Sequence, residues 1–186
     1  MYSMVQAGSL GLPFIAVRGL LDSDLLKFRP DLKVAINPFN PEEEVVIAQP
    51  IRPEVAVFHA RQADPWGNAL TFGPRDDLML ARAARRVIVT AEEIIPRELT
   101  PREAYPNTFL PALDVDAVVL CPGGAHPGSC GTLYGVDKDH LQEYLVSAAT
   151  EESFHDYLKK YIWSTNSEEE YFRKVGWLAP GQKEKL

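Results

Sequence analysis

Cysteine, positive charge and long hydrophobic runs are all scarce in this sequence. It has 2 cysteines in 186 residues, Cys121 and Cys130, and no secretory signal pattern, which argues against a disulfide scaffold and favours free thiols in a reducing compartment. The two thiols and the nearby His126 lack the paired Cys-x-x-Cys spacing of a zinc site, so no metal is predicted. Because no apolar run approaches the length of a membrane span, we expect a cytoplasmic protein with no membrane partner.

Basic residues are also too dispersed to form a nucleic-acid surface. The chain has 19 Lys and Arg residues against 26 Asp and Glu residues, a formal net charge of −7. The basic side chains occur singly or in pairs rather than in a stripe, so nucleic acid is not expected as a partner.

The chain is rich instead in short apolar runs separated by helical or irregular connections. Buried-type strands are expected at residues 13–17, 45–48, 55–60, 87–91 and 116–120. Helical patterns cover residues 76–86, 138–149 and 151–172, and residues 1–11 have the pattern of a helix end. This alternation predicts an α/β fold, an open and mainly parallel sheet with helices on both faces.

The expected organisation is one α/β domain followed by a helical tail. Residues 1–150 are assigned to the domain, and residues 151–186 to a helical C-terminal extension that packs on the domain or on a partner. Trp163, Trp177 and the Lys-rich terminus are expected to belong to this tail. The chain starts as if in the middle of an α/β unit.

Polar or glycine-rich sequence follows three of the predicted strands, after Ala60, Ala91 and Leu120. In a parallel sheet these strand ends lie on one edge, which is where open α/β sheets hold ligands. The three segments are therefore expected to converge.

The segment Cys121–Cys130 is the most informative of the three. It combines adjacent glycines, Gly123 and Gly124, with one histidine and one serine, so it offers backbone N–H donors and a titratable ring in one place. It is not a P-loop, because no Gly-Lys-Ser/Thr follows. The segment is either a simple tight turn or a loop whose Gly123 and Gly124 amides cradle an anion or a thioester carbonyl.

The other polar candidates each have a structural alternative. Glu42, Glu43 and Glu44 are either a solvated charge run or the source of a nucleophile or general base. The pair Glu92 and Glu93 fits a strand end that pairs with Arg86, and His59 fits a satisfied core histidine. Asp64, Gly67 and Asn68 fit a structural turn, although the Asn68 amide could be offered to a ligand.

Five motifs occur in an order that resembles one known family. They are LPFIAVRG at 12–19, NPF at 37–39 followed by Glu42, ARQADPWGNA at 60–69, AARRVIVTAE at 83–92 and PGGAHPGS at 122–129. Together they cover nearly the whole chain and resemble the alpha subunit of family I coenzyme A transferases. The resemblance is to the glutaconate CoA-transferase type and to related ring-cleaving acyl-CoA hydrolases.

The resemblance implies an α/β domain that pairs with a beta subunit, with an acyl-CoA held between the two chains. It implies a CoA thioester as substrate, carboxylic acids as acceptors and no permanently bound cofactor. In the transferases the nucleophilic glutamate belongs to the beta subunit, whereas in the hydrolase-like relatives the position matching Glu42 is the candidate base. The residues expected to contact substrate are Gly123, Gly124, His126, Ser129, Asn68 and Gln62.

The family's alpha subunit opens with a further α/β portion that we expect this sequence to lack, leaving an unfinished sheet edge. Three hypotheses follow. The chain is the alpha subunit of a CoA-transferase-like enzyme, a subunit of an acyl-CoA hydrolase that uses Glu42, or a non-catalytic binding or stabilising subunit.

Overall fold

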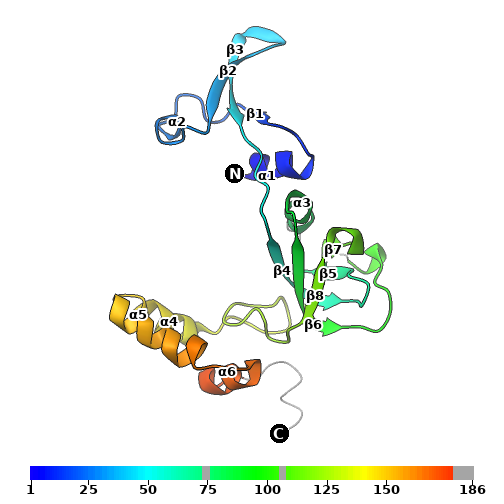
Figure 1. Cartoon of the computed structure of the whole chain (residues 1–186), viewed down its shortest axis with the longest axis vertical. Helices are drawn as coiled ribbons and strands as arrows, with labels where there is room; N and C mark the ends of the chain where they lie inside the picture. The colour runs from blue at the N-terminus through cyan, green and yellow to red at the C-terminus, as the bar shows by residue number, and fades with distance from the viewer. Residues whose placement is uncertain (73–75, 105–107, 178–186) are drawn as a thin grey trace.

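The chain forms three structural regions along one long axis (Figure 1). The computed structural model describes residues 1–72, 76–104 and 108–177. A small antiparallel sheet lies at one end, a larger mixed sheet lies in the middle, and the C-terminal helices lie at the other end. The Lys-rich terminus predicted as part of the tail lies outside the described residues.

The first region is an antiparallel sheet of three strands in the order β1-β3-β2. Its elements are α1 (Tyr2–Ser9), β1 (Ile15–Val17), α2 (Leu25–Phe28), β2 (Lys33–Asn37) and β3 (Asn40–Ala48). Leu32, Val46 and Ala48 form its buried core. The strand expected at 45–48 is therefore longer than predicted and belongs to a hairpin. The Asn37 side chain accepts the Phe39 N–H and so stabilises the turn between β2 and β3.

The central sheet contains five strands in the order β7-β5-β4-β6-β8. Its strands are β4 (Ala56–Ala63), β5 (Ala69–Thr71), β6 (Val87–Ile94), β7 (Thr108–Leu110) and β8 (Ala117–Leu120). The connections between them contain helix α3 (Asp77–Ala83) and two short 3-10 turns, η1 (Pro101–Glu103) and η2 (Ala112–Asp114). Strands β4, β6 and β8 are parallel neighbours, and β5 runs antiparallel to both β4 and β7. Four of the five strands thus share one direction, which confirms the mainly parallel α/β fold.

The two faces of the central sheet differ in burial. On one face Phe58 and Val89 are buried in the main hydrophobic core, together with residues of α3. On the opposite face Val57 is 62% exposed and Val119 is 48% exposed. The β4–β6–β8 register places His59 and Thr90 on this second face.

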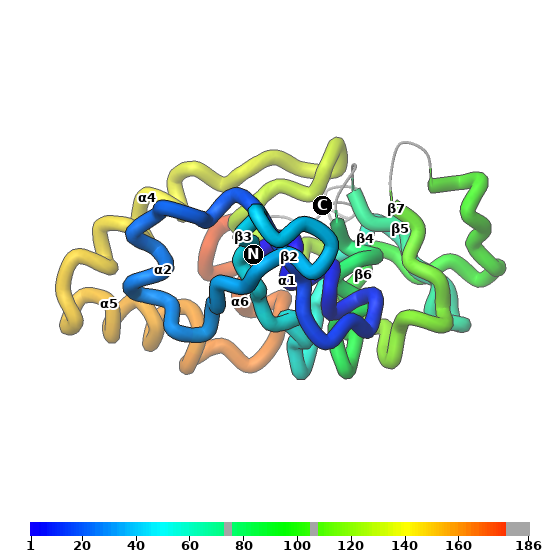
Figure 2. Tube along the Cα trace, turned by 90° about the horizontal axis from the view of Figure 1, so that it is seen from above, coloured from blue at the N-terminus to red at the C-terminus, as the bar shows by residue number. Residues whose placement is uncertain are grey.

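Within the residues that the structure describes, four helical segments follow the central sheet. They are α4 (Lys138–Ser147), α5 (Glu151–Leu158), the π-helical turn η3 (Lys159–Trp163) and α6 (Glu168–Val175). Seen from the N-terminal end, α4 and α5 lie on one side of the molecule, and β5 and β7 lie on the other (Figure 2). None of the described helices is long and apolar enough to cross a membrane.

The continuous helix expected over residues 151–172 is wrong, because the chain breaks between η3 and α6. The Ser164 hydroxyl bonds back to the Lys159 carbonyl at 2.6 Å, which satisfies the end of the first segment. Ser167 then caps α6 by accepting the Glu170 N–H at 3.2 Å. Gly176, with φ 69°, ends α6 in the left-handed conformation that glycine favours.

We expect acid to destabilise the helical region through His140. This residue is 5% exposed, and its Nε2 faces the Tyr157 hydroxyl at 2.9 Å. Burial and the nearby His126 lower the pKa of His140 below the ordinary value. Because the unfolded chain then binds the proton more readily, stability is fully present above about pH 6.5 and is lost as the pH falls below it.

Thermal unfolding between pH 7 and pH 5 tests this prediction. The decrease in Tm on acidification should be smaller in His140→Gln than in the parent. The exposed histidine His155 provides the matched control, His155→Gln. An identical pH dependence in the parent and in His140→Gln would contradict the prediction.

Candidate functional site

The carboxyl ends of β4, β6 and β8 meet at one edge of the central sheet, as predicted from the sequence. The register pairs His59 with Thr90, and Ala91 with Leu120. The glycine loop, residues 121–131, continues directly from β8. This edge brings together polar side chains from two strands and backbone N–H groups from the loop.

Glu92 is the centre of this edge. Its carboxylate contacts His59 Nε2 at 2.6 Å and accepts the Tyr134 hydroxyl at 2.5 Å and the Gly123 N–H at 2.8 Å. The Glu92 side chain is only 6% exposed. Burial alone would raise the pKa of Glu92, but the hydrogen bonds from His59, Tyr134 and Gly123 outweigh it, so the pKa is lowered. Glu92 is therefore a buried carboxylate that fixes the glycine loop to the sheet.

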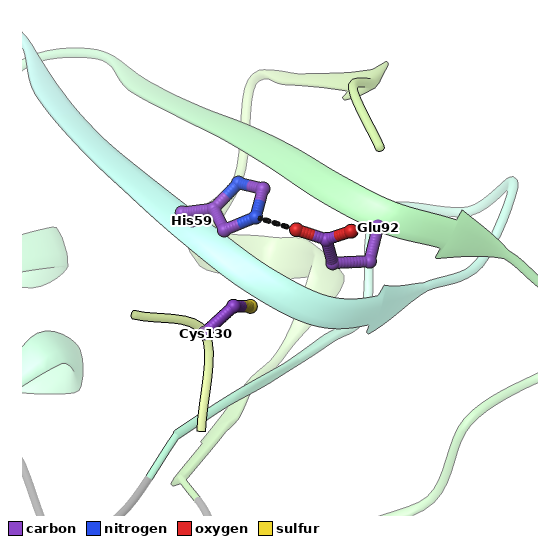
Figure 3. A group of neighbouring side chains, drawn as sticks. All are labelled: His59, Glu92 and Cys130. Carbon is purple, nitrogen blue, oxygen red and sulfur yellow. Dashed lines mark hydrogen bonds and ion pairs between the residues drawn. The ribbon is translucent and has the colours of Figure 1, made fainter. Parts of the chain in front are cut away.

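His59 is oriented by the neighbouring strand rather than by an apolar core. Its Nδ1 lies 2.9 Å from the Thr90 hydroxyl, which in turn lies 3.3 Å from the Phe58 carbonyl oxygen. The ring points along the sheet face toward Glu92 (Figure 3). As interpreted from the sequence, His59 is a satisfied histidine whose side chain is only 17% exposed, but its partners are polar groups of β6. The interpretation of Glu92 as a partner of Arg86 is wrong, because Arg86 pairs with Asp116. The clue in the sequence was the alternation of Thr90 and Glu92, which places both side chains on one face of β6.

The glycine loop needs its glycines for close packing. Gly123 has φ +81°, and a Cβ there would lie 2.7 Å from the rings of Phe172 and Trp177. A Cβ on Gly124 would lie 2.8 Å from Cys121 Sγ and 2.9 Å from His59 Cε1. The Gly123 N–H donates to Glu92, and the Gly124 N–H donates to the Cys121 carbonyl at 3.0 Å. To stabilise an oxyanion, the Gly123 and Gly124 N–H groups would have to leave Glu92 and the Cys121 carbonyl and donate to the substrate oxygen instead.

The other two predicted loop residues differ in exposure. The His126 side chain is 1% exposed, and its ring nitrogens contact the Tyr171 hydroxyl at 2.9 Å and Asp137 Oδ2 at 3.0 Å. Trp177 packs on the same ring at a centroid distance of 4.8 Å. Ser129 is exposed on the loop. The buried His126 side chain therefore stabilises the loop through its contacts, whereas the exposed Ser129 side chain is accessible to a ligand.

Gln62 and Asn68 lie on either side of the turn that follows β4. Gln62 donates to Glu93 Oε2 at 2.8 Å. Asn68 is 7% exposed, donates to Asp64 Oδ2 at 2.8 Å and accepts the Ala112 N–H at 2.8 Å. These hydrogen bonds engage both ends of the Asn68 amide within the fold.

The structure does not bring Glu42 to this edge. Glu42 is exposed on β3, in the hairpin at one end of the long axis, whereas the glycine loop lies on the far side of the central sheet from that hairpin (Figure 1). Its neighbour Glu43 pairs with Arg18 and accepts a hydrogen bond from Asn37 at 2.6 Å. Hydrogen bonds from Asn37 and Arg18 lower the pKa of Glu43. Glu42 is the more accessible of these two carboxylates.

We expect Cys121 to be a poor nucleophile. Its thiol donates to Glu168 Oε1 at 2.9 Å, and burial together with this carboxylate raises its pKa to about 12. Iodoacetamide labelling at pH 8, followed by mass spectrometry, should be about 1,000-fold slower than for an ordinary cysteine, because so little thiolate is present. The unfolded chain provides the reference rate, and labelling at that rate in the folded protein would contradict the assignment.

Two CoA-transferases share this sequence over most of the chain. The A subunit of glutaconate CoA-transferase from Acidaminococcus fermentans is 37% identical over 191 residues, covering 94% of this chain and 59% of the relative. The A subunit of 3-oxoadipate CoA-transferase from Pseudomonas knackmussii is 35% identical over 170 residues, covering 91% of this chain and 59% of the relative. This chain is similar in sequence to the A subunits of these CoA-transferases over more than 90% of its length.

A hydrolase subunit is also similar to this chain in sequence. The cholesterol ring-cleaving hydrolase IpdA subunit of Rhodococcus jostii is 30% identical over 186 residues, covering 96% of this chain and 62% of the relative. The chain therefore spans about 60% of the length of these relatives. No protein-family model matches the chain.

Solved structures confirm the CoA-transferase fold. The crystal structure of glutaconate coenzyme A-transferase from Acidaminococcus fermentans superposes with a TM-score of 0.85 and 36% identity, covering 94% of this chain and 60% of that one. A variant of the decarboxylase AibA/AibB superposes with a TM-score of 0.70 and 38% identity, covering 84% of this chain and 57% of that one.

Proposed function

We propose that this chain acts as the A (alpha) subunit of an enzyme that moves coenzyme A between carboxylic acids. The observation that carries the proposal is the similarity to the A subunits of two CoA-transferases, which extends over more than 90% of the chain. A coenzyme A thioester is then the substrate, and no permanently bound cofactor is required. The thiols of Cys121 and Cys130 suit a reducing cytoplasm.

The glycine loop and the adjoining strand ends are the proposed acyl-CoA contact surface. Gly124 and Ser129 are exposed on this loop, and Gly123 is held to the sheet by Glu92. Since the Glu92 carboxylate is buried and contacts three partners, its proposed role is to position the loop rather than to attack the substrate.

The proposed nucleophile is a glutamate of a B subunit. Its carboxylate would attack the thioester carbonyl carbon, the carbon–sulfur bond would break, and an acyl anhydride and a CoA thiolate would form. The thiolate would then attack the anhydride at the glutamyl carbon, which gives a glutamyl-CoA thioester and releases the first acid. Backbone N–H groups near the thioester would stabilise the oxyanion in each step.

Two observations support a B-subunit partner. Relatives of this chain are named as A subunits, and one solved neighbour is named with two components, AibA and AibB. The sheet face that carries Val57 and Val119 also exposes apolar side chains, as expected of a surface that a partner subunit covers. We therefore infer a hetero-oligomer.

Hydrolysis of an acyl-CoA is the second candidate function. It is favoured by the accessibility of Glu42 and by the similarity to the ring-cleaving hydrolase IpdA subunit. In this alternative Glu42 would activate water or act as the base. Its distance from the glycine loop in the described chain favours the transferase instead.

The two functions are separated by assaying this chain assembled with its B subunit, using glutaconyl-CoA and acetate. Transfer predicts CoA exchange, a borohydride-trapped glutamyl thioester on the B subunit, and substantial activity in Glu42→Ala. Thioester cleavage without exchange, abolished by Glu42→Ala, would instead establish the hydrolase. Glu44→Ala, which removes an exposed carboxylate from the same strand, is the matched control.

A further inference from the structure

We propose that His59, Glu92 and Cys130 form a binding site for a divalent transition-metal cation, zinc being the best match. One ligand atom from each residue lies within 4.8 Å of the other two. The three side chains come from β4, β6 and the glycine loop; His59 and Glu92 point toward each other, and Cys130 lies beside them (Figure 3). The site shares Glu92 and the glycine loop with the proposed CoA contact surface, but cation binding requires neither a substrate nor a partner chain.

The donor set selects the class of cation. An imidazole nitrogen, a carboxylate oxygen and a cysteine sulfur are the three ligand types that Zn²⁺ accepts in proteins. Mg²⁺ and Ca²⁺ prefer oxygen ligands throughout, so sulfur and nitrogen donors disfavour both. Three protein ligands leave a fourth tetrahedral position, which a water molecule can occupy.

The surrounding hydrogen bonds hold two of the ligands in a metal-binding orientation. The Thr90 hydroxyl lies 2.9 Å from His59 Nδ1 and 3.3 Å from the Phe58 carbonyl oxygen, and it holds the ring so that Nε2 faces Glu92 Oε1. A cation bound at Nε2 would displace the proton that this nitrogen shares with Glu92 Oε1, 2.6 Å away. The other carboxylate oxygen is fixed by the Gly123 N–H. Support of this kind is typical of metal ligands.

The third ligand is placed by backbone structure. The Cys130 N–H donates to the Tyr134 carbonyl at 3.0 Å, and the Cys130 carbonyl accepts the Leu133 N–H at 2.9 Å. This tight turn holds a residue that is only 1% exposed beneath the sheet edge. With His59 at 17% and Glu92 at 6% side-chain exposure, the whole cluster is shielded from water, which strengthens charge interactions within it.

The test uses the full chain, purified with a chelator, dialysed and then titrated with Zn²⁺ or Co²⁺ alone. We expect one equivalent to bind, the Tm to rise, and Co²⁺ to give a thiolate-to-cobalt charge-transfer band. Cys130→Ser should abolish that band. Thr90→Val, which removes the hydroxyl that orients His59, should weaken affinity about 10-fold while the band remains.

The second thiol of the chain supplies the matched control. Cys121 lies in the same loop but bonds to Glu168, so Cys121→Ser should keep the stoichiometry and the band. Binding of less than one equivalent to the parent, or a band that survives Cys130→Ser, would overturn the proposal. If Cys130→Ser fails to fold, His59→Gln decides the matter, because unchanged Zn²⁺ affinity in that variant also overturns it. None of these outcomes depends on CoA transfer, so failure here leaves the proposed function intact.

Discussion

Replacing Asp64 with alanine is expected to lower the free energy of unfolding by about 4 kcal/mol, at the upper end for single substitutions. The Asp64 side chain is completely buried. Its carboxylate accepts five N–H groups, which are the backbone N–H groups of Trp66, Gly67, Asn68 and Leu99 and the side-chain amide of Asn68. Burial alone would raise the pKa of Asp64, but these hydrogen bonds outweigh it and lower the pKa.

The effect is large because the donors stay buried when the acceptor is removed. An unsatisfied buried donor costs about 1–3 kcal/mol, and the turn after β4 would have to open to let water reach the freed N–H groups. The expected decrease in Tm is roughly 10 °C for a chain of this length.

Chemical and thermal denaturation measure this effect. Asp31→Ala is the matched control, because Asp31 is a half-exposed aspartate that pairs with Arg29, and its loss should change stability by no more than about 0.5 kcal/mol. Equal stability of Asp64→Ala and Asp31→Ala would show that the Asp64 hydrogen bonds do not hold the turn together.

Replacing Glu92 with glutamine is expected to reduce kcat/KM for CoA transfer by about 10- to 100-fold in the assembled enzyme. A hydrogen bond to a charged group contributes about 1.5–3 kcal/mol, which corresponds to this range. An amide also places an NH₂ group where the carboxylate accepted a hydrogen bond, against either His59 or Gly123. The glycine loop would then lose its anchor to the sheet.

The kinetic constants distinguish positioning from chemistry. If Glu92 positions the loop, the loss should lie in the KM for acyl-CoA, with kcat little changed. Glu93→Gln is the matched control, because Glu93 is the exposed neighbour on the same strand and its carboxylate contacts Gln62 instead. Similar kinetics for Glu92→Gln and the parent enzyme would refute the positioning role.

The sequence predicted the sheet edge well because the pattern of apolar runs is local. The runs around Phe58, Val89 and Val118 are short, mostly β-branched or aromatic, and each is followed by polar or glycine-rich residues. These features depend only on neighbouring residues, and the parallel register of β4, β6 and β8 then brings the strand ends together.

The sequence could not show which polar residues meet across elements. Cys130 and Tyr134 reach Glu92 only because the chain turns back after the glycine loop, and Trp177 reaches His126 only because α6 folds under it. Pairings of this kind depend on tertiary packing, so the spacing of neighbouring residues in the sequence does not predict them. Asn68 was included among the residues expected to contact substrate because its partner is distant in the sequence. In the structure its amide oxygen accepts the N–H of Ala112, which lies 44 residues later in the chain.

Hydrogen exchange of the assembled enzyme, with and without bound coenzyme A, tests most directly whether the sheet edge binds the substrate. The proposed site predicts slower exchange in backbone amides of residues 121–131 when coenzyme A is bound, and unchanged exchange in the β2–β3 hairpin, residues 33–48. Protection confined to the hairpin that carries Glu42, with none in the glycine loop, would contradict it.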